Sequence, residues 1–166
     1  DNETAEKNMA NCFSLILIFA VGLTILFSIF APKLLILFGA SDATLPYAVE
    51  YARIYIFGSI FVLIVLGMNL FITTQGFSKI SMTTLIGAVI NVILDPIFIF
   101  VFDMGVRGAA IATVLSQAVG AIWVLRFLTG EKTILKLKLS NMKLDPKVFG
   151  PCLALGISSF VMISTE

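Results

Sequence analysis

One acidic side chain stands inside a stretch of sequence that is otherwise free of charge. Asp95 lies within the apolar run from Ile80 to Phe102, with Asn91 one helical turn before it and Pro96 directly after it. At about 1.5 Å per helical residue, Asp95 is roughly 22 Å from Ile80 and roughly 10 Å from Phe102, which places it within the hydrocarbon of a bilayer. A carboxylate at that depth is costly, so it is expected to face a helix bundle or a wet cavity and to serve a function.

The residues around Asp95 offer further oxygen atoms. Polar or small residues recur at every fourth position and so share one helix face: Thr83, Gly87, Asn91 and Asp95. Pro96 has no N–H to donate to the carbonyl of Val92, which leaves that oxygen free beside the Asp95 carboxylate and the Asn91 amide. Three hard oxygen groups within about one turn suit Na⁺, or a carboxylate that alternates between a proton and a cation. Asn91 and Asp95 are therefore candidate cation ligands, and Pro96 is a candidate helix bend.

The composition is that of a membrane protein. Hydrophobic residues make up 59% of the 166 residues and charged residues 13%, with a mean hydropathy of +1.06. Three uncharged runs are each about long enough to cross ~30 Å as a helix, namely 12–31, 54–74 and 108–125. The run containing Asp95 is a fourth, and a fifth begins near Val148. The predicted fold class is an all-α integral membrane helix bundle. Because no initiator Met is present and the last run is not closed, we expect a piece of a longer protein.

The positions of the cations predict which ends of the helices face the cytoplasm. Six of them lie between the fourth and fifth runs: Arg126, Lys132, Lys136, Lys138, Lys143 and Lys147. Lys and Arg of short loops stay on the cytoplasmic side. We therefore expect a multi-pass protein of the cell membrane, with residues 1–10 and 126–147 cytoplasmic. The net charge of +1 gives no indication of a nucleic-acid partner.

Prolines, candidate capping residues and a short turn predict where the helices begin and end. Pro32 is expected to break or kink the first helix near the outer interface, and Asp42 is a candidate cap for the second. The short turn at 75–79 predicts that the second and third spans are antiparallel neighbours. The Asp145-Pro146 pair is a start signal for the fifth helix.

Polar side chains on the second helix each leave two interpretations open. The tyrosines recur every fourth residue at Tyr47, Tyr51 and Tyr55. Such a stripe is typical of an interfacial anchor, and contact with a substrate is the alternative. Asn69, in the uncharged part of the same helix, is a candidate for bonding to a neighbouring helix. Tyr55 and Asn69 are therefore possible cavity-lining residues.

The fourth helix carries two parallel rows. The first consists of small residues that favour close helix packing: Gly108, Ala112, Ser116 and Gly120. Beside it lie Thr113 and Gln117, which are polar without charge. Because this helix is the hairpin partner of the one that carries Asp95, both are candidates for the cavity.

Other classes of function are less well supported by the residues. The chain has no His, and its two cysteines, Cys12 and Cys152, are isolated in the sequence. A membrane enzyme, a metal knuckle and a disulfide framework are therefore not favoured. A structural membrane subunit that binds a partner through the small-residue row is the remaining alternative, and it leaves the placement of Asn91 and Asp95 unexplained.

One run carries a specific family resemblance. LIGAVINVILDPIFIF from Leu85, followed by GVRGAAIATVLSQ to Gln117, resembles the multidrug and toxic compound extrusion (MATE) antiporters. The segments LPYAVEYARI, GMN and QG before it, and LGISSF after it, are also similar to that family. The resemblance covers essentially the whole chain, as helices three to six and the start of seven.

The resemblance implies a twelve-helix protein of two six-helix lobes around a cavity. It implies export of organic, often cationic, compounds in exchange for inward Na⁺ or H⁺, with no cofactor beyond that coupling ion. Residues 1–130 would form four helices of the first lobe, 131–146 a cytoplasmic connector, and 147–166 the start of the second lobe. The partners would be small organic substrates, the lipid bilayer and the remaining helices of the transporter.

Individual site residues also follow from the resemblance. Asn91 and Asp95 match cation- or proton-binding positions, and Thr113 matches a further ligand on the sixth helix. Glu166 falls where some members carry an acid on the seventh helix, and solvation at the end of the chain is its alternative role. A flippase for lipid-linked sugars, from the same wider superfamily, is the alternative transporter. Its substrates would favour a cavity rich in Arg and Lys, which these spans lack.

Overall fold

The computed structural model describes residues 1–77 and 83–165, and all of their regular structure is helical. The elements in chain order are α1 (Asn2–Leu37), α2 (Leu45–Thr74), α3 (Thr83–Pro96), the π-helical turn η1 (Ile97–Val101), α4 (Gly105–Thr129), the 3₁₀ turn η2 (Leu139–Asn141) and α5 (Pro146–Ser164). Among these, α1, α2 and α4 are long and apolar enough to cross a membrane. The predicted fold class, an all-α membrane helix bundle, is confirmed.

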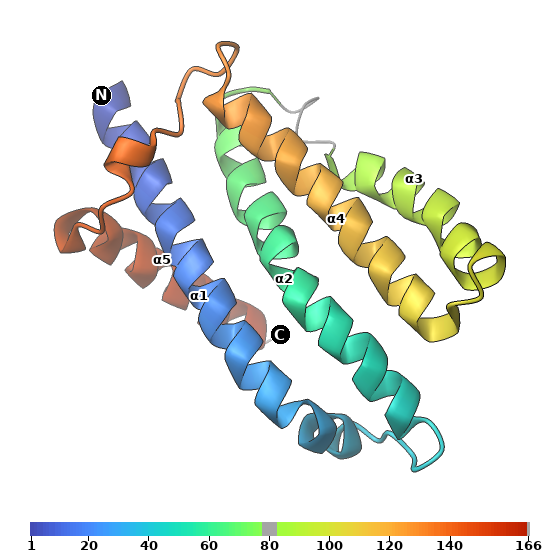
Figure 1. The fold of residues 1–166 in the computed structure, drawn as a ribbon. Coiled ribbons are helices and arrows are strands. Elements are labelled where there is room, and N and C mark those ends of the chain that lie inside the picture. Colours follow the sequence, from blue (N-terminus) through green and yellow to red (C-terminus); the bar gives the residue numbers. More distant parts are fainter. Residues whose placement is uncertain (78–82, 166) are drawn as a thin grey trace.

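The helices form a row in which α4 lies between α2 and α3 (Figure 1). The prediction that the second and third spans are packed neighbours is therefore wrong, although the two helices do run in opposite directions (Figure 1). The physical reason is the small-residue row of α4, whose members are buried and allow helices to approach closely on both sides. A short connection thus fixes the direction of α3 but does not determine which helix packs against it.

The hydrophobic core lies at one end of the bundle. It consists of buried side chains from α1, α2, α4 and the segment after α4: Met9, Ala10, Phe13, Ile64, Val65, Met68, Ile72, Ala121, Val124, Leu128 and Leu137. This end also holds residues 1–10 and the α4–α5 connector (Figure 1), and we refer to it as the inner end because the cations predict that it is cytoplasmic. Toward the opposite end, large apolar side chains such as Ile29 and Phe57 are 67% exposed, as expected of surfaces that meet lipid or further helices.

Of the two outcomes expected at Pro32, the structure excludes a break in the helix, and it corrects the predicted cap of α2. α1 continues through Pro32 to Leu37, because a proline removes only one backbone hydrogen bond and an apolar surrounding favours keeping the others. Asp42 does not cap α2. The N-cap residue is Thr44, which exchanges hydrogen bonds with Ser41 in the preceding turn.

α5 begins at Pro146, as the sequence predicts, and the Asp145 carboxylate accepts a hydrogen bond from the backbone N–H of Lys147 at 3.0 Å. The helix then crosses α1 (Figure 1). Cys152 comes to lie near Cys12 there, and both side chains line one apolar hollow. Both cysteines are free. Two residues that look isolated in the sequence are therefore neighbours in space.

We expect oxidation of the membrane-embedded protein with copper phenanthroline to join Cys12 and Cys152 in a disulfide. Both side chains line the same hollow where α5 crosses α1, so small movements can bring the two sulfur atoms together. The product is an intrachain cross-link, detected by mass spectrometry of linked peptides and reversed by dithiothreitol. A Cys12→Ser variant is the control. Failure to form this link in the wild-type protein would show that α5 is not seated on α1 as described.

Candidate functional site

α3 and α4 approach closely because small residues lie where the helices meet. A Cβ added at Gly108 would lie 2.7 Å from the carbonyl oxygen of Phe98, and one at Gly87 would lie 3.6 Å from the backbone oxygen of Ser116. All four members of the small-residue row are buried. The predicted packing seam is confirmed, and it brings side chains of α3 and α4 within hydrogen-bonding reach.

Three of the predicted site residues meet across this seam. The Nδ2 atom of Asn91 donates to Oδ1 of Asp95 at 3.2 Å and to Oγ1 of Thr113 at 3.3 Å. Thr113 in turn donates to the backbone oxygen of Ala109 at 2.9 Å. The amide of Asn91 therefore stands between a carboxylate on α3 and a hydroxyl on α4.

The Asp95 carboxylate is held by an amide rather than by a fixed positive charge. Within the described residues the ion pairs are Glu3–Lys7, Glu6–Lys138 and Glu50–Arg107, and none of them includes Asp95. Asn91, Asp95 and Thr113 are each half-buried. A carboxylate with a neutral partner can accept a mobile cation or a proton without first breaking a salt bridge.

The backbone changes its helical form directly after the site. Pro96 is the last residue of α3, and the next five residues form η1, where Phe102 donates its N–H to the oxygen of Ile97 at 3.0 Å. The wider π turn follows the position at which Pro96 cannot donate a backbone hydrogen bond. Asp95 thus lies directly before a change in the helical hydrogen-bond pattern.

The other described candidates, Tyr55, Asn69 and Gln117, lie on α2 and α4. Tyr55 stacks on Tyr51 with ring centroids 6.0 Å apart and lines an apolar hollow between α1 and α2. Asn69 on α2 and Gln117 on α4 are half-buried. Glu166 falls outside the described residues.

Sequence reasoning missed an ion pair at the outer end of the bundle. Arg107, at the start of α4, pairs with Glu50, near the start of α2. Both helices begin at the end opposite the core (Figure 1), so the two opposite charges could have been matched once the α2–α4 packing was known. The pair is partly exposed and therefore ties the helices together only weakly.

The oxygen atoms at the α3–α4 seam define what the site could bind. Within the described residues there is no group of three or more acidic, thiol or imidazole side chains that could hold a metal ion. One carboxylate with an amide and a hydroxyl suits a monovalent cation with hard-oxygen preference, or a single proton. Because the amide oxygen of Asn91 can exchange places with its nitrogen by rotation, Asn91 can act as a hydrogen-bond donor or as an oxygen ligand.

Comparisons with known proteins agree on one family. The MatE family model matches residues 1–97. Multidrug export protein MepA of Staphylococcus aureus (strain bovine RF122 / ET3-1) is 27% identical over 134 residues, which is 80% of this chain and 30% of the relative. The protein of the same name from Staphylococcus saprophyticus is 29% identical over 142 residues, or 84% of this chain and 32% of the relative. The chain thus spans about a third of the length of these relatives.

A solved structure shows the same arrangement of helices. The outward-facing conformation of a multidrug resistance MATE family transporter of the MOP superfamily matches with a TM-score of 0.81 and 28% identity. The match covers 90% of this chain and 34% of that chain. The helix row of α1 to α4 is therefore similar to part of a larger transporter.

Proposed function

The chain belongs to the MatE family of membrane transporters, and from this premise we propose that it carries the coupling site of an antiporter that exports organic compounds in exchange for Na⁺ or H⁺. The observation that carries the proposal is the hydrogen-bonded set of Asn91, Asp95 and Thr113. Residues 1–130 then belong to a first lobe, and 147–166 begin a second lobe that is completed by further helices. The relatives named above are multidrug export proteins, which supports organic compounds as the substrate class.

The first step is neutralisation of Asp95. Before the coupling ion arrives, the Asn91 N–H groups satisfy the carboxylate and the Thr113 hydroxyl. A Na⁺ ion entering from the outer side would turn the Asn91 amide so that its oxygen joins the carboxylate and the hydroxyl as a ligand. A proton would instead bind the carboxylate, which then donates a hydrogen bond. Both outcomes neutralise the negative charge of the half-buried Asp95 carboxylate.

The second step couples that change to the organic compound. Asp95 directly precedes Pro96 and η1, where the backbone hydrogen bonding already departs from the α-helical pattern. Neutralisation shifts the balance between two arrangements of this segment, and the organic compound binds the arrangement that the coupling ion disfavours. Such coupling is reciprocal, so outward movement of the compound and inward movement of the ion drive one another.

The test is an ethidium efflux assay in cells that express the complete transporter. The inward Na⁺ gradient and the inward proton gradient are imposed in separate experiments, and we expect efflux to accelerate under the gradient of the coupling ion. Monensin or nigericin, which dissipate these gradients, should remove the acceleration. Efflux that does not respond to either gradient would contradict the antiport proposal, and a response to one gradient alone would identify the coupling ion.

A further inference from the structure

The connector between α4 and α5 is hydrogen-bonded along its length to the ends of the helices. Its first anchor is Gln75, at the end of α2, whose Oε1 atom accepts three hydrogen bonds. The donors are the Thr133 hydroxyl at 2.8 Å, the Ile134 N–H at 2.8 Å and the Leu135 N–H at 2.9 Å. The Nε2 atom of Gln75 donates to the backbone oxygen of Phe71, which fixes the orientation of the amide. One side chain therefore holds three consecutive residues of the connector.

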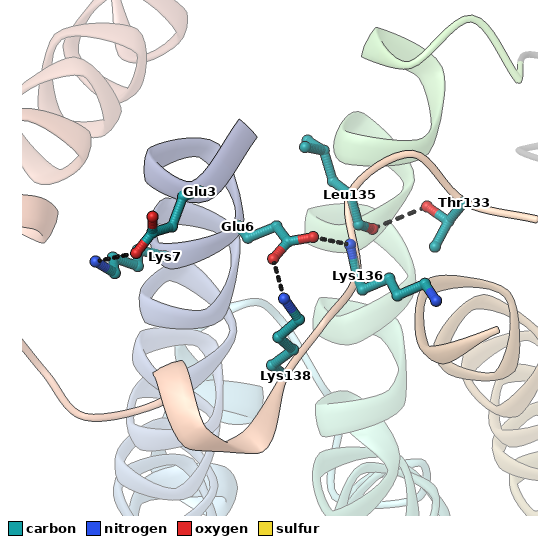
Figure 2. Close-up of polar contacts among 7 residues, drawn as sticks. All are labelled: Glu3, Glu6, Lys7, Thr133, Leu135, Lys136 and Lys138. Atoms are coloured by element: carbon teal, nitrogen blue, oxygen red, sulfur yellow. Dashed lines mark hydrogen bonds and ion pairs between the residues drawn. The ribbon is translucent and has the colours of Figure 1, made fainter. Parts of the chain in front are cut away.

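The second anchor is Glu6, in the first turns of α1. Its carboxylate accepts the backbone N–H of Lys136 at 3.0 Å and pairs with the Lys138 ammonium at 2.8 Å (Figure 2). These partners hold the pKa of Glu6 below its ordinary value of 4.5. Glu6 is only 9% exposed. A charged carboxylate can be buried to this extent because the connector supplies both of its partners. The nearby Glu3 pairs with Lys7 on the same helix instead (Figure 2).

Apolar burial reinforces these two anchors. Leu137 is 7% exposed and belongs to the inner core formed by α1, α2 and α4. Its backbone N–H donates to the oxygen of Leu128 at 2.9 Å, near the end of α4. Thr133 is also buried, at 5% exposure. The connector thus contributes to the core rather than lying outside it.

The far end of the connector is fastened to α1. Asn11 donates to the oxygen of Asn141 at 3.4 Å and accepts the N–H of Asp145 at 3.0 Å. The hydroxyl of Ser14 donates to the oxygen of Met142 at 2.8 Å. Since Asp145 is also the N-cap residue of α5, the position from which α5 starts is bonded to α1.

We propose that residues 133–145 are a clasp that locks the inner ends of α1, α2 and α4 into one unit and fixes the start of α5 on α1. Gln75 and Glu6 are the anchoring residues of its first part, and Asn11 is the anchoring residue of its second part. Movement of α5 relative to the other helices then begins after Asp145 and does not require the connector to detach. This inference concerns the inner end of the bundle and does not depend on which ion or compound is transported.

Trypsin cleavage of the protein in lipid nanodiscs, where both faces are accessible, tests the clasp. Lys136, Lys138 and Lys143 are exposed side chains within it, but cleavage requires the backbone around them to detach. Gln75→Ala is expected to raise the cleavage rate at Lys136 and Lys138 about tenfold, because each lost hydrogen bond multiplies the detached population several-fold. Glu6→Gln should have an effect in the same direction and at the same two sites.

The sites at which cleavage accelerates distinguish release of the clasp from general unfolding. Asn11→Ala should accelerate cleavage at Lys143 more than at Lys136, because it frees only the second part of the clasp. Gln75→Glu keeps the acceptor oxygen but loses the donor to Phe71, so it should accelerate cleavage less than Gln75→Ala does. Glu3→Gln is the matched control, since Glu3 is also on the first turns of α1 but pairs only with its own helix in the described contacts.

Mass spectrometry of timed digests reads each site separately. Wild-type rates in Gln75→Ala and Glu6→Gln, or equal acceleration in Glu3→Gln, would overturn the proposal. If Gln75→Ala does not accumulate in the membrane, Thr133→Val removes one of the three hydrogen bonds and must still accelerate cleavage at Lys136 several-fold.

Discussion

Replacing Asp95 with asparagine is expected to abolish gradient-driven export while the protein stays folded in the membrane. Asparagine has nearly the same shape as aspartate, and its side-chain oxygen can still accept the hydrogen bond from Asn91. It can neither carry a negative charge nor take up a proton, so the coupling ion loses its charged ligand. Coupling energies between sites reach about 1–3 kcal/mol, and their full loss corresponds to a fall in coupled efflux on the order of 100-fold.

Controls for the Asp95→Asn variant separate coupling from folding. Ethidium efflux under imposed gradients is the readout, and the amount of protein in the membrane is measured in the same cells. Asp42→Asn changes an exposed acid in the α1–α2 loop and should leave efflux unchanged. Normal gradient-driven efflux in Asp95→Asn would remove Asp95 from the mechanism, even if the transport function itself is confirmed.

Asn91 and Asp95 could be predicted as partners from sequence because their relation is local. A spacing of four residues on one helix sets their contact, and the 3.2 Å hydrogen bond between them is what that spacing predicts. Thr113 was different, since it lies 22 residues away from Asn91 on another helix. The hairpin relation of the two helices made Thr113 a candidate for the cavity, but only the family resemblance pointed to it as a ligand, because periodicity within a helix does not reveal which residue faces it from a neighbour.

The hydrogen bonds of the clasp could not be predicted from the sequence. The anchors of the clasp join residues that are far apart, with separations of 58 residues for Gln75 and Thr133 and 130 for Glu6 and Lys136. A polar connector has the same composition whether its backbone bonds to water or to side chains of distant helices. The sequence therefore predicted a cytoplasmic connector but could not predict that it is attached.

Gly108 connects the packing of the α3–α4 seam to the candidate site. An alanine Cβ there would lie 2.7 Å from the Phe98 carbonyl oxygen and 2.8 Å from the carbonyl carbon. Both are backbone atoms, so neither can rotate away, and η1 must move off α4. That movement would stretch the 3.3 Å hydrogen bond between Asn91 and Thr113, which spans the same seam.

We therefore expect Gly108→Ala to lower both stability and export. Overpacking of this kind costs about 1–3 kcal/mol, which corresponds to a decrease of about 2–12 °C in the melting temperature of the purified protein. Ethidium efflux should fall about tenfold or more, because precise placement of ligands is lost along with stability. A thermal denaturation series and the gradient-driven efflux assay measure the two effects.

Gly120→Ala is the matched control for this prediction. Gly120 lies in the same buried row of the same helix, but the nearest atom to an added Cβ is a Val65 side-chain methyl at 3.4 Å. Both substitutions favour the helix by similar amounts, about 1 kcal/mol, so that contribution cancels in the comparison. Equal losses in the two variants would mean that the small-residue row matters as a whole. A loss confined to Gly108→Ala would show that the close approach of α4 to the Phe98 backbone is what holds Thr113 against Asn91.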